Sequence, residues 1–287
     1  MWDPTANDEA IEAWNGVLFD KWVRFRHLLT DGLAGHGDAL MAGHPPPEGG
    51  RVIDLGCGLG DTTLTIARAI GPRGLAVGVD ASDRFVEASR KSAVEAGLDN
   101  ARFEVADVQV SPLGGPYDYA FSRFGVQFFS SPVMALRNVR RSLRPGGLLG
   151  VVVWRQREDN PWLHAAQVAV EAVVPQPEKS DQPTCGPGPF SMAGADMVSG
   201  QLLAAGYVRP TFQRHEFDIK IGDDLDEAIE FAMALGPAGE LLRLAGADAE
   251  RYQPAVLKAL RETLTRFVRP EGVLAPSSTW LITATAP

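Results

Sequence analysis

The segment Val52-Ile53-Asp54-Leu55-Gly56-Cys57-Gly58-Leu59-Gly60-Asp61-Thr62 decides the fold of this 287-residue chain. A short apolar run of strand length leads into three glycines at alternate positions, and a helical pattern over residues 61–70 follows them. Glycine is needed where the backbone turns sharply or lies against a ligand, and free N–H groups at a helix start favour an anionic group. We therefore expect a ligand-binding turn between a buried strand and a helix.

Apolar runs of strand length alternate with helical patterns on both sides of this segment. The run over residues 148–154 is apolar on both faces, which is typical of a central parallel strand. Strands are expected over residues 52–55, 75–79, 102–106, 117–121 and 148–154, and helices over residues 61–70, 82–97 and 133–143. This alternation predicts an α/β fold with a parallel sheet and right-handed crossovers.

The two ends of the chain follow other patterns. Residues 8–42 are expected to form one amphipathic helix that carries Trp14 and Trp22, and residues 44–50 form a linker. The aromatic stripe either packs on the flanking helices as scaffold or closes over the strand ends as a lid, and we favour the lid. Toward the C-terminus we expect a helix over 161–174, a loop over 175–192, a helix over 193–206, a strand over 207–221, helices over 223–268 and a strand over 278–285.

Polar side chains stand at the ends of four consecutive predicted strands. Asp54 would suit a cationic ligand, and Asp80 could accept both hydroxyls of a ribose. Asp107 could accept from an adenine amino group, and Arg123 follows the fourth strand. Each of them alone is explained by a turn or a helix cap, but open α/β sheets bind ligands at these strand ends. Their co-occurrence therefore favours a nucleotide-type cofactor.

Other candidate residues are less specific. Arg123 is expected to pair either with a carboxylate of the cofactor or substrate, or with Asp107 or another acidic loop residue. His164 and His27 are weak candidates for a general base, and surface or capping roles compete with that role. No cluster with metal-ligand spacing is visible, so no metal is expected. The weak candidates for a substrate pocket are Trp14, Trp22, Gln127 and Phe128.

Composition limits the partners of this chain. The net charge of −9 disfavours nucleic acid as a substrate, so a small molecule is expected. The first residues lack the pattern of a signal peptide, and no apolar run approaches the ~18 residues of a membrane span. Cys57 and Cys185 give no disulfide framework. These features predict a cytoplasmic protein without a membrane partner, and a homodimer is left open as its assembly.

The segment Asp54-Leu55-Gly56-Cys57-Gly58-Leu59-Gly60 resembles the first motif of class I S-adenosylmethionine-dependent methyltransferases. Asp80, Asp107 and residues 143–148 fall where that family has its later motifs. The chain is most similar to the ubiquinone/menaquinone-methylase-like branch, and Ser122-Arg123-Phe124-Gly125-Val126-Gln127-Phe128-Phe129 and Asn160-Pro161-Trp162 resemble a bacterial subgroup of it. The match covers residues 50–155 well and is looser over the ends.

This resemblance implies a Rossmann-like sheet of seven strands in the order 3-2-1-4-5-7-6, with strand 7 antiparallel. It also implies a helical insertion at about 223–268. With the lid that the aromatic stripe predicts, the expected domains are a helical lid over residues 1–43 and a methyltransferase domain over residues 44–287. The expected reaction is methyl transfer from S-adenosylmethionine to an O, N or C nucleophile of a small molecule, in specialised metabolism or quinone-like biosynthesis. The residues expected to hold the cofactor are Asp54, Gly56, Cys57, Gly58, Gly60, Thr62, Asp80, Ala81, Asp107, Val108, Ser122 and Arg123.

Two other functions are weighed against this one. An NAD-dependent oxidoreductase would show the glycine spacing G-x-G-x-x-G, whereas the spacing here is G-x-G-x-G. A Tyr-x-x-x-Lys dyad for hydride transfer is not recognisable either. A non-catalytic binding module remains as the third hypothesis, and the intact glycine turn and acidic residues disfavour it.

Overall fold

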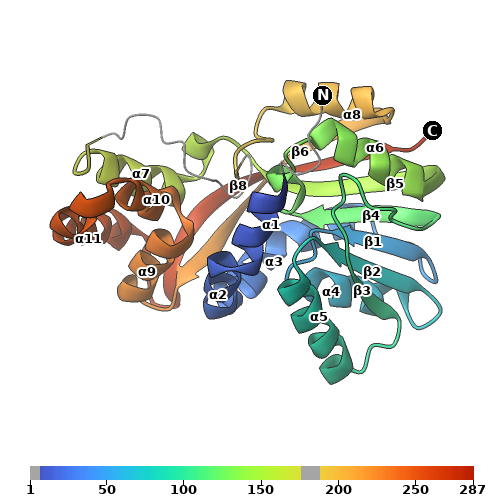
Figure 1. The fold of residues 1–287 in the computed structure, drawn as a ribbon, viewed down its shortest axis with the longest axis horizontal. Coiled ribbons are helices and arrows are strands. Elements are labelled where there is room, and N and C mark those ends of the chain that lie inside the picture. The colour runs from blue at the N-terminus through green and yellow to red at the C-terminus, as the bar shows by residue number, and fades with distance from the viewer. Residues whose placement is uncertain (1–6, 176–187) are drawn as a thin grey trace.

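The structure of the chain, a computed structural model, describes residues 7–175 and 188–287 (Figure 1). These residues form one mixed sheet in the order β3-β2-β1-β4-β5-β8-β6, and a short strand β7 pairs with β8 off this path. The strands are β1 (Arg51–Leu55), β2 (Leu75–Asp80), β3 (Ala101–Val105), β4 (Tyr117–Arg123), β5 (Leu143–Trp154), β6 (Val208–Gly222), β7 (Val268–Arg269) and β8 (Gly272–Thr285).

The pairing of the strands confirms the predicted topology. Strands β1 to β5 pair in parallel, whereas β8 runs antiparallel to both β5 and β6 and takes the place of strand 7. β8 is longer than predicted, because its first residues continue the ladder with β6, where Pro276 pairs with Asp218. That proline hid the strand pattern before residue 278, since proline is rare inside strands.

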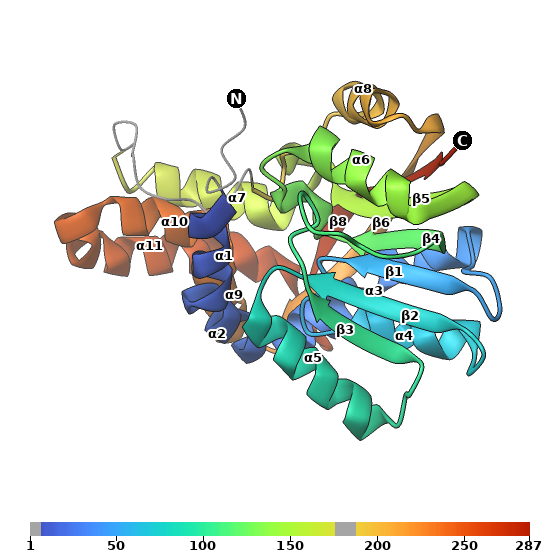
Figure 2. The ribbon, with the colours of Figure 1, turned by 45° about the vertical axis from the view of Figure 1, so that its right-hand side comes forward.

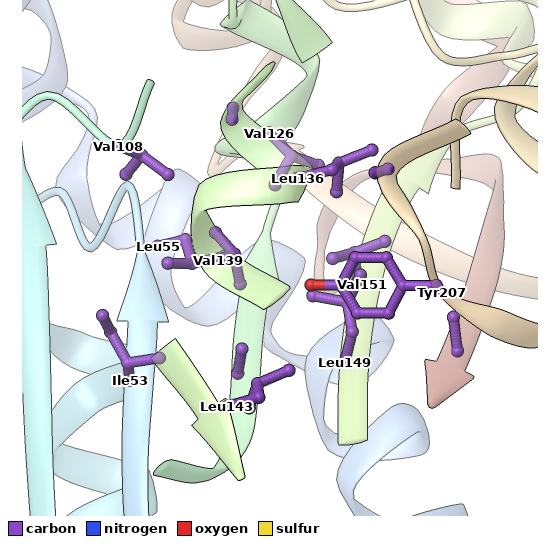
Figure 3. Packing of buried hydrophobic residues seen from close by; sticks show 14 of the residues in the cluster. Ile53, Leu55, Val108, Val126, Leu136, Val139, Leu143, Leu149, Val151 and Tyr207 are labelled. Atoms are coloured by element: carbon purple, nitrogen blue, oxygen red, sulfur yellow. The ribbon is translucent and has the colours of Figure 1, made fainter. Parts of the chain in front are cut away.

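Helices cover both faces of the sheet. On one face α6 (Pro132–Ser142) and α8 (Ala195–Ala205) enclose an apolar cluster with Ile53, Leu136, Val139 and Val151, as Figure 3 shows. On the other face Leu40 and Ile66 belong to a cluster formed with α4 (Asp61–Ile70), and α5 (Asp83–Ala96) packs on β2 and β3. Helix α6 ends one residue before Leu143, which already belongs to β5.

The predicted continuous N-terminal helix is wrong. The segment forms three helices, because the chain bends at Gly16 and Phe25. Phe25 is only 1% exposed and its ring meets that of Phe231, so burial of this side chain accompanies the second bend. The three helices are α1 (Asp8–Asn15), α2 (Val17–Arg24) and α3 (Arg26–Gly43).

Helix α3 belongs to the core rather than to a separable lid. Its side chains Leu28, His36 and Leu40 are buried. A Cβ atom at Gly32 would lie 2.9 Å from the carbonyl oxygen of Lys220, so a glycine is needed where α3 meets β6. A core without residues 1–42 would therefore lose buried packing, and the lid hypothesis is kept below for α1 and α2 alone.

The helical insertion lies between β6 and β8, as the resemblance implies. With α7, its helices enclose a second apolar cluster that includes Trp162, Phe231 and Leu260, and they extend from one end of the sheet (Figures 1 and 2). Residues 176–187 of the predicted loop lie outside the described residues. The helices around this second cluster are α7 (Pro161–Glu171), α9 (Leu225–Leu235), α10 (Pro237–Leu244) and α11 (Ala249–Leu264). None of the described helices is long and apolar enough to cross a membrane.

Candidate functional site

The glycine turn after β1 has the backbone that its sequence predicts. Gly56, Gly58 and Gly60 have φ angles of 68°, 54° and 85°, which lie in the left-handed region. A Cβ atom at Gly56 would lie 3.0 Å from the Cα of Gly125, whereas one at Gly58 would meet nothing within 4 Å. Packing and backbone conformation both require glycine at Gly56, whereas at Gly58 only the backbone conformation does.

A small cavity of about 60 Å³ lies against this turn. Pockets for small-molecule ligands are typically about 300–1,000 Å³. The cavity is therefore smaller than a nucleoside cofactor needs, and it can hold only part of such a ligand. The lining residues are Trp22, Leu29, Thr30, Asp54, Gly56, Cys57, Gly58, Leu59, Asp61, Thr62 and Arg123. Seven of these are candidates from the sequence, and Leu29, Thr30, Leu59 and Asp61 are additional.

Asp54 stands at the end of β1 with its side chain only 2% exposed. Thr63 donates a hydrogen bond of 2.7 Å from its Oγ1 to Asp54 Oδ2. Burial raises the pKa of Asp54 from its usual 3.8 to about 6, although this hydrogen bond and the charge of Arg123 oppose the shift. The carboxylate therefore orders the turn and places a negative charge beside the cavity at neutral pH.

Asp61 closes one side of the cavity. Arg26 Nη2 donates to Asp61 Oδ1 over 3.0 Å, and Thr30 Oγ1 donates to Asp61 Oδ2 over 2.9 Å. The sequence offered a signal only at Asp61, as an acidic residue in the first turn of a helix. Leu29 and Thr30 gave none, because nothing in their local pattern shows that α3 passes over the glycine turn.

Arg123 also lines the cavity. Its Nη1 donates to the carbonyl oxygen of Thr30 over 3.1 Å, and no carboxylate of the described residues forms a salt bridge with it. Burial lowers the pKa of Arg123, while the nearby charges of Asp61 and Asp54 oppose that shift. Asp107 is not its partner, so this alternative from the sequence is wrong, and the guanidinium is available to an anionic ligand.

Asp80 joins the end of β2 to the glycine turn. Its Oδ2 accepts from the backbone N–H of Gly58 over 2.9 Å, and its Oδ1 accepts from that of Ser82 over 3.0 Å. Burial raises the pKa of Asp80, and these two bonds oppose the shift. Each carboxylate oxygen can accept more than one hydrogen bond, so capacity for a diol remains. Ser82 also caps α5, as predicted, because its hydroxyl accepts from Phe85 N–H.

Asp107 behaves as a turn residue in this structure. Its Oδ1 accepts from the backbone N–H of Gln109 over 2.9 Å and from the side-chain amide of Gln109 over 3.3 Å. Its Oδ2 accepts from Nδ2 of Asn7 over 2.8 Å. The following residue, Val108, is buried. The N-terminal segment thus reaches the place that the sequence assigns to adenine.

Residues at the end of β4 and just after it brace the strand ends around the site. The Oγ of Ser122 donates to the carbonyl oxygen of Leu55 over 2.7 Å, which links the ends of β4 and β1. Gln127 is 1% exposed and its Oε1 accepts from the backbone N–H of Trp154, so it braces β5. Phe128 packs edge-on against Trp14 with ring centroids 5.1 Å apart. Of the four weak pocket candidates, only Trp22 lines the cavity.

Neither histidine proposed as a base lies at the cavity. His27 Nε2 is 3.1 Å from Glu227 Oε1 on the surface, and His164 lies on α7. Ligating atoms of His27, Asp223 and Glu227 lie within 4.8 Å of one another, although Asp223 also pairs with Lys220. The sequence could not show this grouping, because His27 lies far along the chain from Asp223 and Glu227.

Nothing in the sequence indicates the pair formed by the buried His36 and the half-buried His215. Nδ1 of His36 lies 2.9 Å from Nδ1 of His215, and Nε2 of His36 lies 2.7 Å from Oγ of Ser277. Ser277 donates to the carbonyl oxygen of Phe217, so it accepts from His36 and holds His36 as the Nε2–H tautomer. Burial lowers the pKa of His36 to about 3, with the charges of His215 and Arg123 adding to the shift. This neutral pair fastens α3 to β6 and β8.

Comparison with known proteins identifies the domain that carries these features. Residues 52–147 match the family described as methyltransferase domain, which covers the glycine turn and the strand ends up to Gly147. The chain carries a class I S-adenosylmethionine-dependent methyltransferase domain. The family resemblance and the predicted sheet order are thereby confirmed.

Individual relatives match this methyltransferase domain over part of their length. An uncharacterized 37.1 kDa protein in transposon Tn4556 of Streptomyces fradiae is 33% identical over 121 residues, which are 42% of this chain and 34% of that protein. Demethylmenaquinone methyltransferase of Staphylococcus aureus is 29% identical over 103 residues, which are 36% of this chain and 42% of the enzyme. The matches thus span less than half the length of these curated relatives.

Two solved structures share the fold over most of the chain. Phosphoethanolamine N-methyltransferase 2 of Haemonchus contortus, in complex with phosphomonomethylethanolamine and S-adenosylhomocysteine, aligns with 98% of this chain and 60% of its own, with a TM-score of 0.55 and 14% identity. The YcgJ protein of Bacillus subtilis aligns with 88% of this chain and 97% of its own, with a TM-score of 0.51 and 19% identity. At these identities the likeness concerns the fold alone.

Proposed function

We propose that this chain transfers a methyl group from S-adenosylmethionine to an O, N or C nucleophile of a small molecule. The observation that supports this most is the gathering of Asp54, Asp80, Asp107 and Arg123 at the carboxyl ends of four adjacent strands, around the glycine turn. Such strand ends are the ligand-binding edge of open α/β sheets.

The donor set fits the cofactor along its length. Arg123 offers guanidinium N–H groups to the carboxylate of the methionine moiety, and Asp54 places a negative charge near the ammonium and sulfonium. Asp80 retains acceptor capacity for the ribose hydroxyls. Asp107 and the backbone of Val108 would take the adenine. The charges and donors are thus ordered as a zwitterionic nucleoside requires.

When bound, S-adenosylmethionine supplies a methyl group already activated by a sulfonium. The protein then has to align the nucleophile with the methyl–sulfur bond and exclude water while the new bond to carbon forms and the old one breaks. The cavity lining contains no histidine among the described residues, and we assign no general base. The described residues therefore act by binding and orientation.

Several observations favour a small acceptor. The net charge of −9 disfavours a polyanionic substrate. Demethylmenaquinone methyltransferase, one of the relatives, is named for a small quinone acceptor. We therefore place the reaction in specialised metabolism or quinone-like biosynthesis, in the cytoplasm. The acceptor would enter between α2, the end of β4 and the helical insertion.

Calorimetric titration tests the cofactor, and a labelling experiment tests the reaction. The protein should bind S-adenosylmethionine and S-adenosylhomocysteine but not NAD. With methyl-labelled cofactor and an extract of the host, label should appear in a low-molecular-weight compound. Binding of NAD alone would favour the oxidoreductase hypothesis. Tight cofactor binding without transfer to any extract would favour a non-catalytic module.

A further inference from the structure

Helix α1 lies over the residues that we assign to the adenosine half of the cofactor. Figure 2 shows it close to α5, whose N-terminus follows the Asp80 loop. Near the C-terminal end of α1, Asn15 Oδ1 accepts from the hydroxyl of Ser82, and Arg84 donates to the carbonyl oxygen of Asn15 over 2.9 Å. Trp14 packs on Phe85 with ring centroids 6.3 Å apart. This end of α1 is firmly attached beside the ribose position.

The other end of α1 is attached through Asn7. The carboxamide nitrogen of Asn7 donates to Asp107 Oδ2 over 2.8 Å, and its Oδ1 accepts from Ser130 Oγ over 3.1 Å. Because Ser130 holds the oxygen, the NH₂ group is fixed toward the carboxylate. Gln109 already supplies both donors to Asp107 Oδ1. Asp107 Oδ2 accepts only the bond from Asn7 among the described residues, so it is the oxygen left for a ligand, and a ligand that approaches it must share it with Asn7 or displace Asn7.

We propose that Asn7 competes with the 6-amino group of adenine for Asp107, so that cofactor entry must release the N-terminal end of α1. A carboxamide NH₂ and the amino group of adenine are both planar, neutral donors on a trigonal carbon, so one carboxylate oxygen recognises either. The contacts of Asn15 hold the other end of α1 in place while Asn7 is exchanged. This inference rests on the proposed function, because it assumes an adenosyl ligand at Asp107.

Competition and simple covering of the bound adenine predict affinity changes of opposite sign when Asn7 is removed. If Asn7 only covered bound adenine, its removal would weaken binding, since a protein–ligand contact would be lost. If Asn7 competes, its removal strengthens binding, because the cofactor no longer has to break the charge-assisted hydrogen bond between Asn7 and Asp107. The affinity for S-adenosylhomocysteine should then rise by roughly threefold to tenfold, because Asn7 and Asp107 are both only half-buried.

The experiment measures the affinity for S-adenosylhomocysteine by calorimetry in the full chain. Asn7→Ala should bind about threefold to tenfold more tightly than the parent. Ser130→Ala, which frees the oxygen of Asn7, should change affinity in the same direction by less. With an analogue that carries hydrogen in place of the 6-amino group, parent and Asn7→Ala should differ by less than about twofold, because that analogue does not need Asp107.

Asn100→Ala provides the matched control. Its carboxamide donates to the carbonyl oxygens of Ala67 and Gly71, before β3 begins, and so at the opposite edge of the sheet. It should lower the melting temperature without changing the affinity of the folded protein. Unchanged or weaker binding by Asn7→Ala, with a parent that binds, would overturn the competition and leave the cofactor site intact. A parent that binds no S-adenosylhomocysteine would instead overturn the proposed function.

Discussion

The carboxylate of Asp80 accepts a hydrogen bond of 2.9 Å from the backbone N–H of Gly58, and so ties the end of β2 to the middle of the glycine turn. The same carboxylate accepts from Ser82 N–H with its other oxygen. Asp80 therefore shapes the turn even without a ligand. Any role in holding ribose is added to this structural one, and experiments must separate the two.

Asp80→Ala should reduce cofactor affinity by about 2–4 kcal/mol, because a pair of charge-assisted hydrogen bonds to the ribose is lost. Calorimetry with S-adenosylhomocysteine measures this loss, and urea unfolding measures the structural part. Asp80→Asn keeps one oxygen acceptor without the charge, and should lose less affinity. If Asp80→Ala stays folded and binds as tightly as the parent, Asp80 is only a brace for the turn.

Gly58→Val should abolish measurable cofactor binding with a smaller effect on folding. Its φ of 54° makes a side chain there strained by about 1–2 kcal/mol, and the added atoms would enter the space beside the turn. Gly97→Val is the matched control, because Gly97 has a φ of 63°, has no neighbour within 4 Å of an added Cβ, and ends α5 away from the turn. Equal loss of binding in both variants would mean that strain alone is responsible.

The sequence predicted the sheet and the strand-end residues because their signals are local. A strand, alternate glycines and a following helix can be recognised within Val52 to Thr62, and Ser82 can be recognised as a cap from its position. Asp61 is a different case, because its partners Arg26 and Thr30 lie on another helix. Helical periodicity shows which face of α3 is apolar but not which part of the sheet that face covers.

The same limit applies to the histidines. The N-terminal amphipathic segment makes His27 a weak candidate for a base, with a surface role as the alternative, and the structure places it beside Glu227 on the surface. Nothing in the sequence indicates that His36 is buried in a hydrogen-bonded pair, because its partners His215 and Ser277 lie on β6 and β8, far from it along the chain. The bend at Phe25 also depends on a contact with Phe231, which no local pattern reports.

Stability should fall as the pH drops below about 6.5, because His36 is buried as the neutral form. Its pKa is about 3 in the folded protein and near 6.5 when unfolded, so the unfolded chain binds more protons in this window. The loss reaches about 2 kcal/mol at pH 5 and continues to about pH 3. Urea unfolding between pH 8 and pH 4 measures it. His36→Gln should be less stable at pH 8 and should show a flatter pH dependence, and an equally steep profile would exclude His36 as the source.

Cofactor affinity should fall in the same range for a separate reason. The pKa of Asp54 is raised to about 6 in the free protein, so the carboxylate is protonated below that pH and no longer attracts the ammonium and sulfonium. Affinity for S-adenosylmethionine should decrease by up to about tenfold per pH unit below pH 6. Asp54→Asn keeps an oxygen for Thr63 and should bind more weakly at pH 8, with the pH dependence largely removed. A variant that keeps the full dependence would assign it to another group.

The lid hypothesis now concerns α1 and α2, and of these α2 has no buried residue. Exposed ion pairs attach it to its neighbours, Arg24 to Glu230 and Arg84 to Asp20, and such pairs contribute only about 0–1 kcal/mol each. Trp22 of the same helix lines the cavity. Phe19 of α2 also packs edge-on against Phe85 with ring centroids 5.0 Å apart, so ion pairs and aromatic contacts hold α2 in place of a buried face. A helix attached in this way can move as a lid without opening the core.

Saturating S-adenosylhomocysteine should protect α2 from trypsin, which cleaves after Lys21 and Arg24, and should change the tryptophan fluorescence. Trp22→Phe should remove most of the fluorescence change and weaken binding several-fold, because an aromatic wall of the cavity is altered. Trp280→Phe is the matched control, since its indole N–H donates to the carbonyl oxygen of Ala193 and the residue does not line the cavity. The ligand-induced change should persist in that variant. If cleavage after residues 21 and 24 proceeds at the same rate with and without ligand, α2 is scaffold, and closure of the site must come from another element.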